Sequence, residues 1–304
     1  MERLLFRGIV VLLGLSIGTY TPAIGTAFLT IPSNPRELAL GGSTSSIAGD
    51  PSLARGNPAL IVQTFPAMEI GFGYNAWFAG ARGTSVLITQ PAFHGTLGFG
   101  VRNMGISDLE LRPSRPTDEY DAHFTVSGIA VEGIWGRQFD RLRLGGTLRW
   151  IRIESYVYNS SGLSVDLGAW WPLMRNRISI GASVRNLGSM GPMLYENPSL
   201  PVTFQTGITF RVTSGKETET HQLQSLMTVG AEISDKHRFV ARVAGEVVFG
   251  EVRITLGTRL SEEVTEVAGA VNLRLRLFQV SYGLAIGSHQ LGIPHLFHVK
   301  ARLP

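Results

Sequence analysis

The feature that most constrains the fold is a repeated phrase of roughly ten residues in which apolar and polar side chains alternate, followed by a turn. The segment 177–185 is the clearest case, because Ile178, Ile180 and Val184 fall on one face and small or charged residues fall on the other. A helix would need apolar residues at spacings of three and four, which these segments do not offer. The alternation therefore predicts β-strands, whose successive side chains point to opposite faces.

Fourteen such segments can be delimited along the chain. They are 68–78, 82–91, 94–103, 122–136, 141–154, 162–172, 177–187, 202–212, 221–233, 237–248, 251–260, 264–275, 277–287 and 293–303. The number is even, and each segment has about the length with which a tilted strand crosses a bilayer. Ile129 and Val131 are out of phase with the rest of 122–136, so we expect a bulge in that segment.

Composition restricts the class of protein further. Charged residues make up only 16% of the 304 residues, whereas about 25% is usual for a soluble domain. Hydrophobic residues reach 44%, too many for a disordered chain. Beyond the N-terminus no apolar run is long enough for a transmembrane helix. With no cysteine, disulfides, thiolate metal sites and a lipid anchor on cysteine are excluded. A soluble β protein and an outer-membrane barrel remain.

The N-terminus indicates export. A short basic start precedes the apolar stretch 8–17, and small residues follow in 23–25, which is the order found in a secretory signal. We therefore expect residues 1–25 to be a cleaved signal peptide. The net charge of +4, with no basic block, gives no reason to expect nucleic-acid binding.

Alternation alone also fits a soluble sandwich, but two further features favour a membrane barrel. Aromatic residues stand near segment ends, as in the belts at a lipid–water boundary: Trp77, Phe78, Trp135, Trp150, Trp170 and Trp171. Lone charges occupy many polar positions and would face a lumen, although a solvated sandwich face would look similar. The predicted lumen-facing residues are Arg102, Asp166, Arg185, Glu232, Arg253, Arg259 and Arg302.

Connection lengths support the barrel independently. The longest gaps, 104–121 and 188–201, are the third and the seventh, whereas even-numbered gaps such as 137–140 and 173–176 are tight. Gap eight, 213–220, is an exception. Short turns at one end and longer loops at the other are typical of an outer-membrane barrel with both termini in the periplasm.

Residues 26–67 precede the barrel, which we place at 68–304, and they do not alternate. Glycine and proline punctuate this segment, which also contains Phe28, Leu29, Ile31, Leu38 and Leu40. A flexible tail would not need these apolar side chains. We therefore expect the segment to fold into the lumen as a plug, and we call it the hatch.

Several stretches resemble a known family. The passage at 38–60, with LALGGS and IAGDPSLARGNPAL, resembles the N-terminal signature of FadL-like outer-membrane barrels, above all the PorV/PorQ family of type IX secretion systems. Stretches 161–188 and 200–210 fit that family, and 229–246 fits less specifically. The resemblance implies a fourteen-stranded barrel with an N-terminal hatch, and a role in delivering or attaching secreted cargo. It assigns the hatch motif to Gly41, Gly42, Asp50, Asn57 and Pro58.

The chain also departs from that family. It is short for a PorV-type shuttle and has modest outer loops, which places it nearer the PorQ type. It ends at 301–304 without the terminal aromatic residue of many barrels. Relatives outside secretion take up hydrophobic molecules, so the fold alone leaves the function open.

No catalytic or cofactor motif stands out in the sequence. His295 and His298 are three apart on a predicted strand, so their side chains should lie on opposite faces and make a poor metal pair. The acidic stretch 118–121 fits a solvated loop tip better than a calcium site. We therefore predict a protein that is not an enzyme and has no cofactor or metal.

The two long gaps carry the residues left over for binding a partner. Arg, Tyr and Met beside apolar residues are enriched in protein interfaces. The predicted partner-binding residues are Leu109, Leu111, Arg112, Arg115, Tyr120, Met190, Met193, Leu194 and Tyr195. The alternative is that both loops fold inward and cap the barrel.

The sequence thus predicts a bacterial outer-membrane barrel, surrounded by lipid, that acts as an adaptor in type IX-like secretion and binds a protein through its outer loops. One alternative is a FadL-like channel for hydrophobic small molecules, which would need an apolar pocket beside the hatch. Another is a structural barrel that anchors a surface protein. The charged and small lumen residues favour the adaptor over an apolar channel.

Overall fold

The computed structural model describes residues 24–63, 67–111, 121–214, 223–234, 238–288 and 292–303. Most of the expected signal peptide lies outside these residues. So do three predicted partner-binding residues, Arg112, Arg115 and Tyr120.

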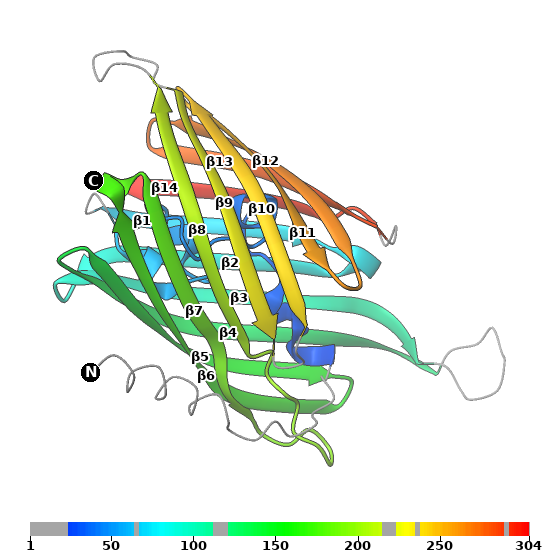
Figure 1. Cartoon of the computed structure of the whole chain (residues 1–304). Coiled ribbons are helices and arrows are strands. Elements are labelled where there is room, and N and C mark those ends of the chain that lie inside the picture. Colours follow the sequence, from blue (N-terminus) through cyan, green and yellow to red (C-terminus); the bar gives the residue numbers. More distant parts are fainter. Residues whose placement is uncertain are drawn as a thin grey trace.

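Fourteen antiparallel strands form a closed barrel in which every strand pairs with its sequence neighbours and β1 closes the ring against β14 (Figure 1). The strands are β1 Met68–Ala76, β2 Arg82–Ala92, β3 Gly95–Leu111, β4 Ala122–Phe139, β5 Leu142–Ser155, β6 Tyr158–Leu173, β7 Ile178–Met190, β8 Thr203–Ser214, β9 Leu223–Ser234, β10 Phe239–Phe249, β11 Val252–Ser261, β12 Thr265–Leu275, β13 Phe278–Gly287 and β14 His295–Leu303. The predicted fold class and strand number are confirmed.

The barrel wall is apolar on its outside. In β11, Ile254 and Leu256 are 49% and 61% exposed, whereas Thr255 between them is fully buried inside. A soluble sandwich buries its apolar face, so this arrangement rules out the sandwich and fits a wall that contacts lipid. Among the described residues, no helix is long and apolar enough to cross a bilayer.

Strands β3 and β4 extend further than the sequence predicts and project from one end of the barrel (Figure 1). We call this the outer end, and the end where β1 begins and β14 finishes the inner end. The expected bulge is not within β4 but in its partner, where the β3–β4 register shifts between Ile106 and Leu109. Ile129 and Val131 keep their outward phase. The pattern looked broken because Ile134, which faces inward, is also apolar and packs beside Ile61 of the hatch.

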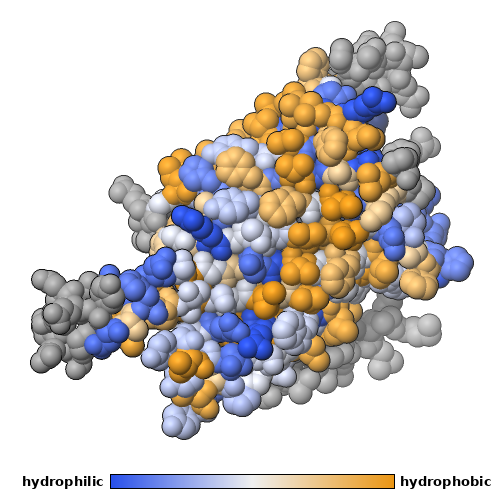
Figure 2. All heavy atoms as spheres, turned by 180° about the vertical axis from the view of Figure 1, so that it is seen from behind, coloured by the Kyte–Doolittle hydropathy of each residue, from blue (hydrophilic) through white to orange (hydrophobic). Residues whose placement is uncertain are grey.

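On the outer ends of β2 to β5 the outward face becomes polar. Thr84, Asn103, Arg152 and Ser127 occupy positions that are apolar lower on the wall. Seen from behind, hydrophilic side chains gather toward this projecting end (Figure 2). The projecting part of the sheet therefore lies beyond the apolar belt.

The aromatic belt is smaller than predicted. Trp135, Trp150 and Trp171 face outward and are 39–49% exposed. Trp170 points into the barrel instead, where its indole N–H donates to the Ser46 carbonyl over 2.9 Å. Trp77 packs against interior apolar clusters. Strand alternation assigns Trp170 to the inner face, so counting it among the belt residues was wrong.

Short 3-10 helices lie in two of the described turns between strands: η4 Phe78–Gly80 and η5 Met174–Asn176.

Candidate functional site

The described residues before β1 form four short helices: η1 Ile24–Thr30, α2 Pro35–Ala39, η2 Pro51–Leu53 and η3 Pro58–Ile61. Helix α2 contacts β11 to β13, whereas η3 contacts β4 to β6, so the hatch spans the lumen. Three of these helices, α2, η2 and η3, have the same N-terminal sequence pattern, an Asn or Asp N-cap followed by proline. The side chains of Asn34, Asp50 and Asn57 each accept a hydrogen bond from a backbone N–H in the first turn of the helix that follows.

The apolar side chains of the hatch are shielded from water inside the barrel. Leu40, Ile47, Leu53 and Leu60 are fully buried in one cluster with the inward-pointing Trp170. This burial removes apolar surface from water and so stabilises the hatch inside the lumen.

Glycines on the inner face of the wall make room for the hatch backbone. A Cβ atom at Gly168 would collide with the Asn57 side chain, and one at Gly181 would collide with the Ser45 carbonyl. A Cβ atom at Gly145 would also overlap with the backbone of Pro58. The contact is a polar one as well, because the Asn57 side-chain amide donates to the carbonyls of Ser45 and Ala169 at 2.7 and 3.0 Å.

The hatch motif also contains two consecutive glycines in the left-handed region. Gly41 and Gly42 have φ values of 59° and 79°, a conformation that other residues adopt only with strain. An added Cβ at Gly41 would lie 3.0 Å from the Thr258 carbonyl, and one at Gly42 would lie 3.1 Å from Nε of Arg242. Both the turn and the close wall require glycine there.

Buried ion pairs fasten the hatch to opposite walls of the barrel. Arg36 in α2 donates to Glu246 of β10 at 2.7 and 2.8 Å and to Asp50 at 3.0 Å. Asp50 in turn accepts from Lys300 of β14 at 3.1 Å. On the other side, Arg55 pairs with Glu132 of β4.

Charge pairing sets the ionisation of the hatch carboxylate. Burial alone would raise the pKa of Asp50, but Lys300 and Arg36 hold that pKa well below its usual range. Asp50 is therefore ionised at neutral pH. Its negative charge is what joins α2 to β14 through Arg36 and Lys300.

The predicted lumen-facing residues all lie on inward positions of their strands, and all but Arg259 make a hydrogen bond or an ion pair among the described residues. Arg102 reaches the Leu29 carbonyl at 3.1 Å, Asp166 pairs with Arg149 at 2.6 Å, Arg185 pairs with Glu232 at 2.7 Å, Arg253 pairs with Glu246 at 3.2 Å, Arg302 pairs with Glu69 at 2.6 Å, and Arg259 lines a cavity. The sequence reasoning missed Arg36, Arg55, Glu132 and Glu246. The available signal was their position in the hatch or on an inward strand face.

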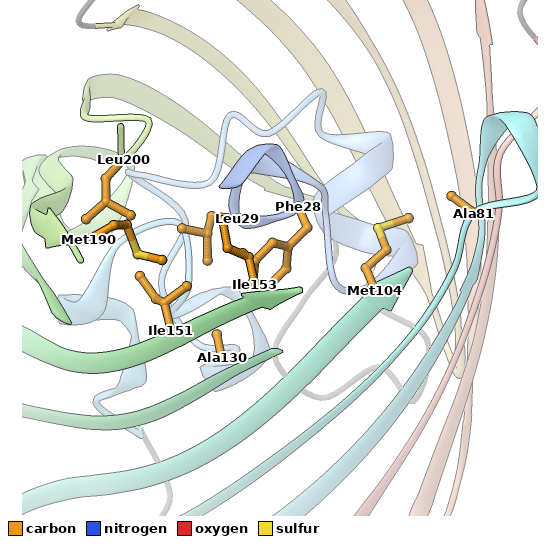
Figure 3. Close-up of a cluster of buried hydrophobic side chains, with 9 residues drawn as sticks. All are labelled: Phe28, Leu29, Ala81, Met104, Ala130, Ile151, Ile153, Met190 and Leu200. Carbon is orange, nitrogen blue, oxygen red and sulfur yellow. The ribbon is translucent and has the colours of Figure 1, made fainter. Parts of the chain in front are cut away.

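The outer half of the lumen holds an apolar cluster. Phe28 and Leu29 of η1 pack with Ile151 and Ile153 of β5, and Figure 3 shows these side chains meeting inside the barrel. The other members are Ala81, Met104, Ala130, Met190 and Leu200, with Ile31, Trp77, Ile106 and Met193 packed against them. We call this set the outer cluster.

A cavity of about 290 Å³ lies on the other side of η1, against β8 to β11 and the turn that follows β11. Thr26, Ala27 and Thr30 line it from η1, with Arg259 and Phe239 among the wall residues. Two hydroxyl groups of lining residues, on Thr203 and Ser234, are buried and have no hydrogen-bond partner in the part of the chain that the structure describes. We call this space the outer cavity. It is open to polar as well as apolar ligand groups.

The predicted partner-binding residues separate into two groups. Leu111, Leu194 and Tyr195 are 36%, 56% and 98% exposed, and Leu109 is half-buried. Met190 is only 4% exposed and belongs to the outer cluster, against which Met193 also packs. Assigning Met190 to a partner-binding surface was therefore wrong, because its side chain is buried, whereas Met193 is partly exposed and its role stays a prediction.

The two histidines singled out in the sequence do lie on opposite faces of β14. His295 faces outward and its Nδ1 is 2.7 Å from the Tyr282 hydroxyl, whereas His298 is buried inside. No group of three or more potential metal ligands occurs among the described residues.

Comparison with known proteins places the fold. No protein-family model matches the chain, and no curated protein does. Solved structures do resemble it. The CymD monoaromatic hydrocarbon channel superposes with a TM-score of 0.62 at 12% identity, over 92% of this chain and 97% of that one. A Pseudomonas aeruginosa FadL homologue gives 0.56 at 9%, over 90% and 98%. The P. putida toluene transporter TodX gives 0.52 at 10%, over 88% and 96%.

Two of these neighbours, CymD and TodX, are described as a hydrocarbon channel and a toluene transporter. They do not bear on the PorV/PorQ resemblance, which stays a prediction. At these identities the likeness concerns the fold alone. By structural similarity, the chain is a FadL-like fourteen-stranded β-barrel of the bacterial outer-membrane type.

Proposed function

We propose that the protein is an uptake channel for small hydrophobic molecules. The observation that carries this proposal is the arrangement around η1, which has the apolar outer cluster on one side and the outer cavity on the other. A cavity of about 290 Å³ is near the lower limit for small-molecule sites. The structural likeness to hydrocarbon channels supports the same reading.

The charges of the lumen, which favoured an adaptor when the sequence alone was considered, do not oppose this function. Glu232 and Arg259 line the outer cavity, and lumen charges are neutralised in pairs such as Arg149 with Asp166 and Arg185 with Glu232. Both pairs join one wall strand to another, and the side chains that make up the outer cluster itself are all apolar.

The test is to fill the outer cavity. Ala27 lines the cavity from an exposed position on η1, so Ala27→Trp occupies it without disturbing the outer cluster. Ala79→Trp, on the exposed turn after β1, is the matched control. We expect intact cells that express the protein to take up a radiolabelled monoaromatic hydrocarbon faster than cells without it. Uptake should fall for Ala27→Trp and stay unchanged for Ala79→Trp. Equal uptake with and without the protein would refute the channel.

We also propose, as a second function, the attachment of a protein at the outer end. Its support is Tyr195, which is 98% exposed beside the exposed Leu194. A partner protein should co-purify from membranes with the wild-type barrel. It should be lost from a variant in which 194–195 is replaced with Gly-Ser, a change that leaves Met190 in place. A partner retained by this variant would count against the adaptor.

A further inference from the structure

The inner end of the barrel carries a small hollow beside the β12–β13 turn. Its free volume is about 30 Å³, and it is lined by Arg274, Arg276, Lys300 and Arg302, together with Gln279. A space of this kind holds more than a single water molecule and suits a compact polar group.

The basic side chains around the hollow are not balanced by carboxylates. Glu69 of β1 accepts from Arg302 at 2.6 Å and lies 3.4 Å from Lys300, and Lys300 also donates to Asp50. The guanidinium groups of Arg274 and Arg276 have no hydrogen bond or ion pair within the described chain. The hollow therefore has excess positive charge, and its two solvent-exposed guanidinium groups can donate to an anion.

The hollow also lies at the edge of the apolar wall. Leu275 and Phe278 are opposite each other in the β12–β13 pair and are 49% and 53% exposed on the outside. Leu303, at the end of β14, is 39% exposed. A group bound in the hollow is thus a side chain's length from a surface that acyl chains cover. At the outer end, by contrast, the exposed turn after β11 is acidic, with Glu262 and Glu263.

We propose that this hollow, here named the basic hollow, binds a phosphate group. Guanidinium groups match phosphate oxygens in geometry and charge, and two unpaired arginines beside one another supply that match. The phosphate can belong to the headgroup of an anionic phospholipid in the adjoining leaflet, with its chains over Phe278, or to a free phosphate in the aqueous phase. The proposal is independent of the uptake function.

The experiment uses the purified full-length barrel in nanodiscs of phosphatidylcholine, with or without phosphatidylglycerol. Bound phosphatidylglycerol is counted by native mass spectrometry after transfer to detergent. The variant Arg274→Gln/Arg276→Gln is compared with Arg141→Gln/Arg177→Gln, which removes the same charge from exposed turns of the same end. Charge-assisted hydrogen bonds of this kind lead us to expect about a tenfold loss of bound lipid in the first variant and none in the second.

A second arm separates the two sources of phosphate. Inorganic phosphate is titrated into the lipid-free protein in detergent, and binding is measured calorimetrically for the same two variants. Saturable binding of inorganic phosphate that only Arg274→Gln/Arg276→Gln abolishes assigns the hollow to a free phosphate. Selective lipid retention without it assigns the hollow to a headgroup. Equal effects of both variants, or no effect of either, would overturn the phosphate site.

Discussion

Arg36 of the hatch and Glu246 of β10 form a bidentate ion pair in the interior of the barrel, with Nε to Oε2 at 2.7 Å and Nη2 to Oε1 at 2.8 Å. Both side chains are at most 5% exposed. Removing one partner of a pair this deeply buried costs much stability, because the remaining charge is then neither paired nor hydrated.

Replacing Glu246 with Gln should therefore lower the free energy of unfolding by about 3–5 kcal/mol. The measurement is urea unfolding of the barrel in lipid vesicles. Glu263→Gln is the control, because Glu263 meets Arg238 in an exposed pair at 3.3 Å, which should contribute less than about 1 kcal/mol. If both variants cost the same, the Arg36 pair does not hold the hatch.

The pairing of Asp50 predicts a pH dependence. Its pKa is held well below the usual range by Lys300 and Arg36, against the effect of burial. A depressed pKa stabilises the folded state above the unfolded-state pKa of about 4, and this stabilisation is lost as the pH falls. Wild-type protein should therefore exceed Asp50→Asn in stability by a constant amount from pH 5 to 8, as about one unit above that pKa suffices. The difference should shrink below pH 4. A difference independent of pH would contradict the ionised Asp50.

The glycine contacts predict that one methyl group can loosen the hatch. Gly168→Ala places its Cβ against the Asn57 side chain, so we expect a loss of about 1–3 kcal/mol from overpacking. Gly133→Ala is the matched control, because nothing lies within 4 Å of a Cβ there. Thermal unfolding of both variants checks the difference, and equal midpoints would mean that the wall yields easily at Gly168.

The height of the apolar belt can be tested with a single charge. Ile180 faces outward between Trp171 and Ile208, so Ile180→Arg should cost about 2–4 kcal/mol in a bilayer. Thr125 faces outward too, but on the projecting part of β4, and Thr125→Arg should cost nothing measurable. A comparable penalty at Thr125, measured in the same vesicles, would place the belt higher than the polar residues indicate.

Strand number and orientation could be predicted because the outward face contacts one uniform solvent. Ile254 and Ile180 need only be apolar, and alternation records that need directly. The inner face has no such rule. Glu132 and Ile134 both point inward from β4, yet one meets Arg55 and the other packs beside Ile61. Whether an inward position needs a charged or an apolar residue depends on which part of the folded hatch lies against it, and alternation does not encode that path.

The loop residues show the same limit. Met190 and Tyr195 stand five positions apart in one connection, and composition treated them alike, yet they are 4% and 98% exposed. What separates them is the apolar cluster around Phe28, whose position follows from tertiary structure. The outer cavity escaped prediction for the same reason, because η1 from the N-terminal segment and β8 to β11 from the second half of the barrel form it together.

The fit between Gly168, Gly181 and the hatch backbone has a consequence for the order of assembly. Where the hatch and the wall are too close for even an added methyl group, a folded hatch cannot slide into a closed barrel. The hatch precedes β1 in the chain, and the ring closes only when β1 meets β14. The hatch must therefore reach its final fold in contact with the strands, and it cannot enter a closed ring as a finished unit.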